Sequence, residues 1–138
     1  MPRLDTIHNA VKNALVKDGW RITDDPYIIE YKRTKLFADL AAEKALAAER
    51  NGQQIVVEIK SFIGTSKLHD LKEALGQYDI YYYLLEATAP ERRLYIAIGE
   101  NAYQQFFNQD AIALVIARHR VPLIVVNLDT EEVVQWIN

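Results

Sequence analysis

Cysteine is absent from this chain of 138 residues. Its absence excludes a disulfide framework and any metal site built on thiolates. Long apolar runs are absent as well, since no stretch approaches the roughly 18 residues that a membrane span needs. The N-terminal segment 1–15 lacks the continuous apolar core of a signal peptide, so a cytoplasmic protein outside the membrane is the simplest expectation.

An excess of positive charge is also missing, because the formal net charge is -3 at pH 7. Proteins that coat nucleic acid are usually basic, so this balance argues against that class. This charge balance does not exclude an enzyme that binds DNA through one local basic patch. Hydrophobic residues make up 50% and charged residues 25%, and no linker divides the chain, which predicts one globular domain over residues 1–138.

The first half of the chain predicts one helix and then strands. Residues 5–20 place apolar side chains on one helical face, with Asp5 as the N-cap and Asp-Gly as the stop. Residues 27–43 are predicted to form two strands around an Arg-Thr-Lys turn. Residues 45–50 and 53–62 are predicted to pair, because the Asn-Gly dipeptide between them is a strong hairpin signal.

The second half alternates helices and strands. Residues 65–87 predict a long helix capped by Ser66, and residues 92–99 predict a central strand. A helix broken near its Asn-Gln-Asp segment is expected over 101–120, followed by two strands within 122–137. The fold class is therefore α/β, a mixed sheet flanked by helices. The apolar stripe expected on the long helix is Leu68, Leu71, Leu75, Tyr78, Tyr82 and Leu85.

Several large side chains are expected in one core around this sheet. Trp20 and Trp136 are most simply core anchors. In the run 81–83 the tyrosines other than Tyr82 are expected at the surface or an interface, with stacking on nucleic-acid bases as the alternative. The other residues expected to be buried are Leu71, Leu75, Ile96, Ile98, Val125 and Val126.

The strand at 53–62 carries an acid and a base on one face. Side chains alternate along a strand, so Glu58 and Lys60 share a face, and Asp39 and Glu43 share a face of a preceding strand. If the two strands pair, two carboxylates and one ammonium converge beside the sheet. Close carboxylates repel unless a cation lies between them, and oxygen ligands suit Mg²⁺ or Mn²⁺.

The ordinary alternative is a charge pair on a solvent-facing sheet surface. Glu-x-Lys is common there, and such a pair contributes little to stability. The context favours a site instead, because Asp39 lies upstream and a long helix follows Lys60.

Asp39 followed by Glu58-Ile59-Lys60 resembles the signature of the PD-(D/E)XK nucleases. A wider resemblance is to the XisH family, small bacterial proteins named as excision controlling factors for the fdxN element, which interrupts a nitrogen-fixation gene. The combination of VEIKSF with ALGQY is specific to it. The segments that carry this resemblance are 5–26, 38–62 and 74–81.

The resemblance implies a restriction-endonuclease-like fold and a set of site residues. Asp39 and Glu58 would be metal ligands, and the carbonyl of Ile59 would complete the shell around Mg²⁺ or Mn²⁺. Lys60 would be the catalytic cation. Gln77 matches a glutamine that related nucleases carry on the helix after the lysine, although an exposed polar residue explains it about as well.

Some positions depart from the signature or remain open. Ala38 stands where the signature name has proline, a residue that is often missing in the superfamily. His8 or Asp5 could replace the acid that related nucleases aim from the first helix at the metal, although an ordinary surface histidine explains His8 more simply. Glu43 is a further ligand candidate, with a surface acid as the simpler reading.

The resemblance leaves two functions open. The first is a Mg²⁺-dependent DNA endonuclease that acts in programmed excision of a DNA element. The second is a non-catalytic accessory factor that keeps the nuclease fold as a platform for DNA or for a separate recombinase. Expected partners are DNA and a small XisI-type protein, and a homodimer is open as well.

Overall fold

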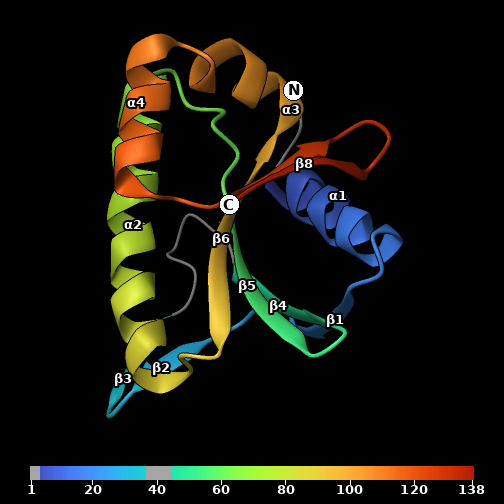
Figure 1. Ribbon diagram of the computed structural model, residues 1–138, viewed down its shortest axis with the longest axis vertical. Coiled ribbons are helices and arrows are strands. Elements are labelled where there is room, and N and C mark those ends of the chain that lie inside the picture. The colour runs from blue at the N-terminus through green and yellow to red at the C-terminus, as the bar shows by residue number, and fades with distance from the viewer. Residues whose placement is uncertain (1–3, 37–44) are drawn as a thin grey trace.

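A mixed β-sheet with helices on both faces forms the centre of the computed structural model, which describes residues 4–36 and 45–138 (Figure 1). No helix of these residues is long and apolar enough to cross a membrane. In chain order the elements are α1 (Leu4–Lys17), β1 (Arg21–Asp24), β2 (Ile29–Tyr31), β3 (Thr34–Leu36), β4 (Ala45–Arg50), β5 (Gln53–Ile59), α2 (Lys67–Thr88), β6 (Arg92–Gly99), α3 (Glu100–Ala102), the π-helical turn η1 (Tyr103–Phe107), α4 (Asp110–His119), β7 (Leu123–Asn127) and β8 (Glu132–Ile137).

The described strands confirm the α/β class and the mixed sheet. Six of them pair in the order β1-β4-β5-β6-β7-β8, and β2 and β3 form a separate hairpin within the described part of the chain. The pairs β5/β6 and β6/β7 are parallel, and the other neighbours in the large sheet are antiparallel. As its continuous apolar run predicted, β6 is an interior strand, parallel to both neighbours.

The hairpin of β4 and β5 forms at the predicted Asn-Gly turn. Asn51 has φ 51° and Gly52 has φ 82°, the positive values that a two-residue hairpin turn requires. The register runs from Arg50 opposite Gln53 to Ala45 opposite Glu58. This register places the acid of the Glu-x-Lys motif beside the first residue of β4.

The expected single core is divided by the sheet into two clusters. Alternate residues of each strand face opposite sides, so Val56 packs on the α2 side and Val57 on the α1 side. Val125 likewise faces α2, whereas Val126 packs with the helix α1. Helices lie on both faces of the sheet (Figure 1), and the residues of β5 from Ile55 to Ile59 are all buried.

The long helix α2 is confirmed, and its apolar stripe is narrower than predicted. The hydroxyl of Ser66 accepts a hydrogen bond from the backbone N–H of His69 and caps the helix. Leu68 and Tyr82 are exposed, and Leu75 is only partly buried. The prediction was wrong for Leu68, in the first turn, and for Tyr82, which lines a groove beside β6, whereas Leu75 packs against the core from a partly buried position.

The N-terminal third departs furthest from the prediction. Strand β1, which pairs with β4, was not predicted, because its four residues are mostly exposed and show no strand alternation. Helix α1 begins at Leu4, so Asp5 lies inside it and is not the N-cap. The turn between β2 and β3 falls at Lys32 and Arg33 instead of the Arg-Thr-Lys triplet.

Candidate functional site

Glu58 and Lys60 are buried, with only 3% and 4% of their surfaces exposed. They are two and four residues after Val56, and side chains alternate along a strand, so both lie with Val56 on the face of the sheet that α2 covers. The alternative of a solvent-facing charge pair is therefore wrong. The sequence pattern misleads here because helices cover both faces of β5.

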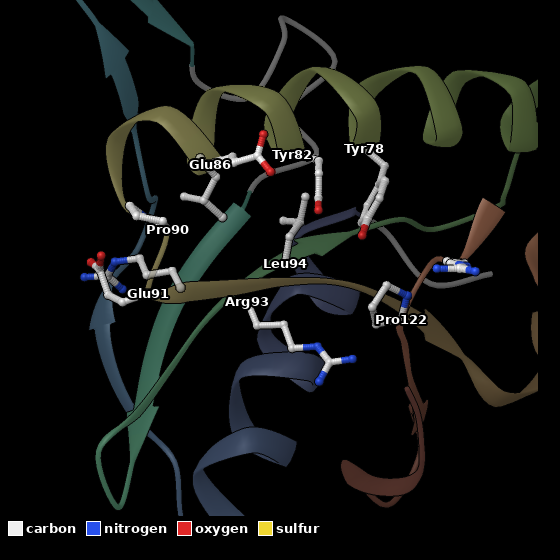
Figure 2. A pocket seen from close by; sticks show the side chains of 11 residues that line it. Tyr78, Tyr82, Glu86, Pro90, Glu91, Arg93, Leu94 and Pro122 are labelled. Atoms are coloured by element: carbon white, nitrogen blue, oxygen red, sulfur yellow. The ribbon is translucent and has the colours of Figure 1, made fainter.

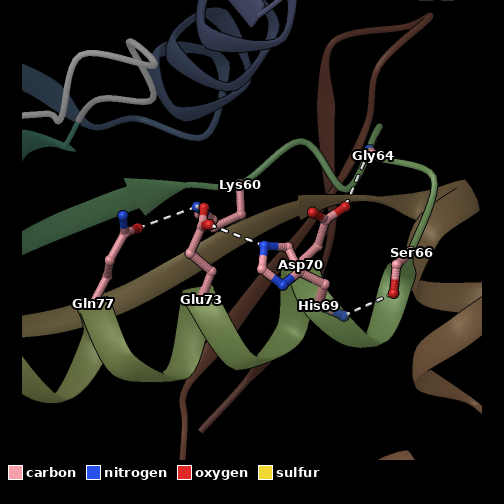
Figure 3. A network of polar contacts seen from close by, with 7 residues as sticks. All are labelled: Lys60, Gly64, Ser66, His69, Asp70, Glu73 and Gln77. Atoms are coloured by element: carbon pink, nitrogen blue, oxygen red, sulfur yellow. Dashed lines mark hydrogen bonds and ion pairs between the residues drawn. The ribbon is translucent and has the colours of Figure 1, made fainter.

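The amino group of Lys60 is directed at α2 (Figure 3). Its Nζ donates a hydrogen bond of 3.1 Å to Oε1 of Gln77 and lies 3.8 Å from Oε1 of Glu73. The backbone N–H of Lys60 donates to the carbonyl of Ala97 at 3.0 Å, which extends the pairing with β6 past the end of β5. Glu73 is 53% exposed, so the ammonium lies where a buried strand end meets the surface of the helix.

The predicted residue Gln77 belongs to a polar row on α2. His69, Glu73 and Gln77 are four residues apart and therefore follow one face of the helix. Nε2 of His69 lies 3.5 Å from Oε2 of Glu73. Glu73 was not predicted as a site residue, although its spacing from Gln77 is the signal that could have identified it.

The loop between β5 and α2 is tied down by side-chain contacts. The backbone N–H of Gly64 donates a hydrogen bond of 3.1 Å to Oδ2 of Asp70. A Cβ atom at Gly64 would lie 2.8 Å from both carboxylate oxygens of Asp70, so any larger residue would displace that carboxylate. Nζ of Lys67 donates to the carbonyls of Phe62 and Gly64.

Phe62, two residues after Lys60, anchors the same loop in the core. It has φ 54°, a left-handed conformation that is rare outside glycine. Its buried ring contacts Phe107 edge-on, with 5.1 Å between ring centroids. The position of Lys60 is thus fixed from both directions, by the strand pairing before it and by the packed loop after it.

Glu58 lies between the two neighbouring strands, opposite Ala45 of β4 and Ile96 of β6. The charge of its carboxylate affects the pKa of Tyr78 of α2. Burial raises the pKa of Tyr78 to about 12, and the negative charge of Glu58 adds to that rise. The carboxylate therefore lies within electrostatic range of the covering helix, in the same layer as the ammonium of Lys60.

Two of the predicted acids, Asp39 and Glu43, lie outside the described residues. Ile59 ends β5 and is buried. The described residues contain no group of three or more His, Cys, Asp or Glu side chains that could hold a metal ion. The donors that the structure does describe, the Glu58 carboxylate and the Ile59 carbonyl, are the hard oxygen ligands that Mg²⁺ takes, so their chemistry fits that ion.

The histidine of the first helix has a different partner. Nε2 of His8 lies 2.8 Å from Oδ1 of Asp25, and Nζ of Lys12 lies 3.0 Å from Oδ2 of the same carboxylate. Burial raises the pKa of Asp25, but the contacts with His8 and Lys12 outweigh it and hold that pKa below its usual value. His8 is therefore accounted for by an ion-pair cluster at the start of the fold.

The aromatic predictions are mostly confirmed. Tyr78 is in the core, and its ring stacks on that of Tyr82 with 6.0 Å between centroids. Tyr83 is 65% exposed, as expected for a surface tyrosine. Trp20 is buried and packs 5.7 Å from the partly buried ring of Trp136.

Comparison with known proteins identifies the family. The XisH protein family matches residues 1–134. A fdxN element excision controlling factor protein from Anabaena variabilis has a similar crystal structure, with a TM-score of 0.89, 40% identity, and coverage of 97% of this chain and 99% of that chain. The crystal structure of an XisH family protein from Nostoc punctiforme PCC 73102 is also similar, with a TM-score of 0.89 and 39% identity. The match covers 97% of this chain and 100% of that chain. No curated protein matches. This chain belongs to the XisH family.

Proposed function

We propose that this protein is a metal-dependent endodeoxyribonuclease of the PD-(D/E)XK type that acts in the excision of a DNA element. The observation that carries the proposal is the placement of Lys60. Its ammonium is buried at the end of β5, on the face that carries Glu58, and is oriented by Gln77. Two residues of the signature, Glu58 and Lys60, thus share one face of the sheet, and Gln77, the glutamine that the resemblance implies, contacts the lysine.

Burial of these charges supports a functional reading. Removing a carboxylate and an ammonium from water is unfavourable by roughly several kcal/mol per ion. Only well-placed opposite charges and hydrogen bonds offset that desolvation. Apolar residues of similar size at both positions would serve the core at least as well. Charged groups that a fold retains at such a cost are candidates for chemistry, especially at the end of a central strand.

In this proposal the chain holds Mg²⁺ or Mn²⁺ through Asp39, Glu58 and the carbonyl of Ile59. The bound ion would polarise the scissile phosphate and lower the pKa of a water molecule. Lys60 supplies positive charge where negative charge develops on the phosphate. Gln77 accepts a hydrogen bond from Lys60 and so restricts the directions in which the ammonium can point.

The biological setting of the proposal comes from the named relative. The Anabaena variabilis protein is an excision controlling factor for the fdxN element. We therefore propose DNA at an element junction as the substrate, in the cytoplasm, with an XisI-type protein as the partner. A homodimer would place two such sites on one DNA molecule.

A cleavage assay tests the proposal directly. The protein is incubated with supercoiled, branched and element-junction DNA, with Mg²⁺ or Mn²⁺ or with EDTA, and with or without the partner. Nicking or cutting that requires the metal ion and disappears in Glu58→Gln supports the proposal. Intact DNA under all of these conditions would refute it.

One observation favours the accessory function as a second candidate. The ammonium of Lys60 is already engaged by Gln77 and Glu73, and little of it reaches solvent. In that case the Glu58 and Lys60 pair would be part of the architecture of a binding platform. Excision in cells that carry Glu58→Gln would then be near normal, whereas a nuclease would lose it.

A further inference from the structure

Strand β6 extends beyond its neighbour β7 at the end of the sheet away from Lys60. The pairing with β7 begins at Ile96 opposite Leu123, so residues 92–95 have no partner on that side among the described strands. The N–H of Ile96 donates to the carbonyl of Pro122 at 3.0 Å. Because backbone groups alternate direction along a strand, the N–H of Leu94 points to the same side, into a notch beside the sheet.

Two arginines border this notch, Arg93 from β6 and Arg120 from the connection between α4 and β7. Both are exposed, and neither forms a salt bridge within the described part of the chain, unlike Arg21 and Arg50. The guanidinium of Arg93 lies over the ring of Tyr95 at 5.4 Å. Guanidinium groups and an outward backbone N–H are the donors that an anion with several oxygens takes, and both arginines line the same hollow.

A groove of about 460 Å³ beside β6 is lined by both arginines and by Tyr78 and Tyr82 of α2. Figure 2 shows the two tyrosines on the helix side of β6 and Arg93 extending from the other side of the strand. The hydroxyl groups of Tyr78 and Tyr82 point from the helix toward the strand. The positive charge of Arg93 opposes the rise in the pKa of Tyr78, so the two groups interact electrostatically. The ring of Tyr82 is 45% exposed and offers an aromatic surface beside the anion site.

Acidic residues limit how much negative charge the groove can hold. Glu86 and Glu91 line the end near Pro90, while Tyr78 and Pro122 lie at the other end (Figure 2). Arg92 also lines the groove, but its guanidinium lies over the ring of Tyr27 and only partly offsets these carboxylates. A strand threaded through the groove would bring further phosphates against them, which is unfavourable. The groove therefore fits one phosphate at the arginine end, followed by a neutral planar group over Tyr82.

We propose that the notch beside Arg93 and Arg120 binds one phosphate of a nucleotide, with the base against Tyr82. The nucleotide is either a free nucleoside monophosphate or the phosphorylated end of a DNA strand. This site requires neither a metal ion nor Lys60, so it does not depend on the proposed nuclease activity.

Titration calorimetry in EDTA tests the site with deoxyadenosine monophosphate as the probe. Arg93→Gln and Arg120→Gln should each weaken binding by about tenfold or more, the scale of one charge-assisted hydrogen bond. Arg118→Gln, at an exposed arginine of α4 outside the groove, should change it less than about twofold. Tyr82→Leu should weaken binding, while Tyr83→Leu, on the neighbouring exposed ring, should not.

Further ligands distinguish a free nucleotide from a phosphorylated DNA end and include the results that would overturn the proposal. A 5′-phosphorylated oligodeoxyadenosine that binds more tightly than both its unphosphorylated form and the free nucleotide identifies a strand end, and preference for the free nucleotide identifies a small ligand. No measurable binding of either, or equal binding of inorganic phosphate or hexanoate, would overturn the proposal. Lys60→Met should bind the nucleotide as the parent does, whether or not the nuclease proposal holds.

Discussion

Lys60 and Gln77 are joined by a hydrogen bond of 3.1 Å between Nζ and Oε1, which connects the end of β5 to the middle of α2. The lysine is buried, and the glutamine is partly buried. A glutamine can orient an ammonium without neutralising it, whereas the nearby carboxylate of Glu73 reduces its field. The hydrogen bond therefore fixes the direction of the ammonium and leaves its charge in place.

The role of Gln77 can be tested by removing its acceptor. Gln77→Leu should lower kcat for DNA cleavage by about tenfold with little change in KM, because the ammonium loses its orientation and not its charge. Gln77→Glu should restore part of the rate, since a carboxylate also accepts from Lys60. Gln104→Leu, on the exposed surface of η1, is the matched control and should be neutral. A wild-type rate for Gln77→Leu would contradict this positioning role.

The carboxylates assigned to the metal ion should control its affinity. Asp39→Asn and Glu58→Gln should each weaken Mn²⁺ binding strongly, because a neutral amide oxygen is a poorer ligand for a divalent cation. Without metal, the free energy of unfolding of Glu58→Gln should equal or exceed that of the parent, since repulsion between the two proposed carboxylate ligands is relieved. Calorimetry and urea unfolding measure the two quantities. Unchanged Mn²⁺ affinity in both variants would place the metal elsewhere.

The sequence predicted the elements where local signals agree with the packing. The Asn-Gly turn fixed the β4–β5 hairpin, and the cap at Ser66 fixed the start of α2. It missed β1, which is held by pairing with β4 and not by its own pattern. It also expected Tyr82 inside, because helical periodicity does not reveal where the underlying sheet ends.

For the described part of the candidate site, the sequence predicted the shared face of two residues but not their environment. Alternation along β5 gave the shared face of Glu58 and Lys60, and the structure brings Gln77 to the lysine. Burial of the pair could not be read from the strand alone, because it depends on α2 covering that face. Glu73 was overlooked for the same reason. Its spacing of four residues from Gln77 predicts that both lie on one face of a helix, but only the tertiary packing shows that this face meets Lys60.

Tyr78 should make stability sensitive to alkaline pH. Burial raises the pKa of its phenol from 10.0 to about 12 in the folded protein. The neutral phenol therefore stabilises the fold fully below pH 10, and this contribution, up to roughly 2.5 kcal/mol, is lost as the pH rises through 12. Urea unfolding from pH 9 to 11.5 should show a smaller decline for Tyr78→Phe than for the parent. Tyr83→Phe should follow the parent, and identical curves for all three proteins would refute the assignment.

Asp25 should stabilise the protein at neutral pH and not in acid. Burial raises its pKa, but His8 and Lys12 lower it below the ordinary 3.8. Its contribution is therefore present above pH 3.8 and is lost as the pH falls through the folded-state pKa. Asp25→Asn should cost roughly 1 kcal/mol at pH 7 and approach the parent in strong acid. Asp129→Asn, at an exposed position, is the control; a cost for Asp25→Asn that does not change with pH would contradict the ion-pair account.

Lys60→Met separates catalysis from architecture at the centre of the site. Methionine keeps an unbranched apolar stem and removes the charge, and Gln77 and the half-exposed Glu73 can turn to solvent. On the catalytic role, the melting temperature should stay within a few degrees of the parent, and Mn²⁺ should bind at least as well, because a neighbouring positive charge is gone.

Cleavage by Lys60→Met should fall by about 100-fold or more, the scale of losing one electrostatic group aimed at the reacting phosphate. Lys72→Met, at an exposed lysine on α2, should keep the parent rate and shows that loss of one positive charge is not enough. Melting temperature, Mn²⁺ affinity and excision in cells are measured on the same preparations. A variant that melts far below the parent would make Lys60 a structural tie between β5 and α2. A stable variant with full excision would remove Lys60 from the chemistry and leave the accessory function as the one that the buried pair serves.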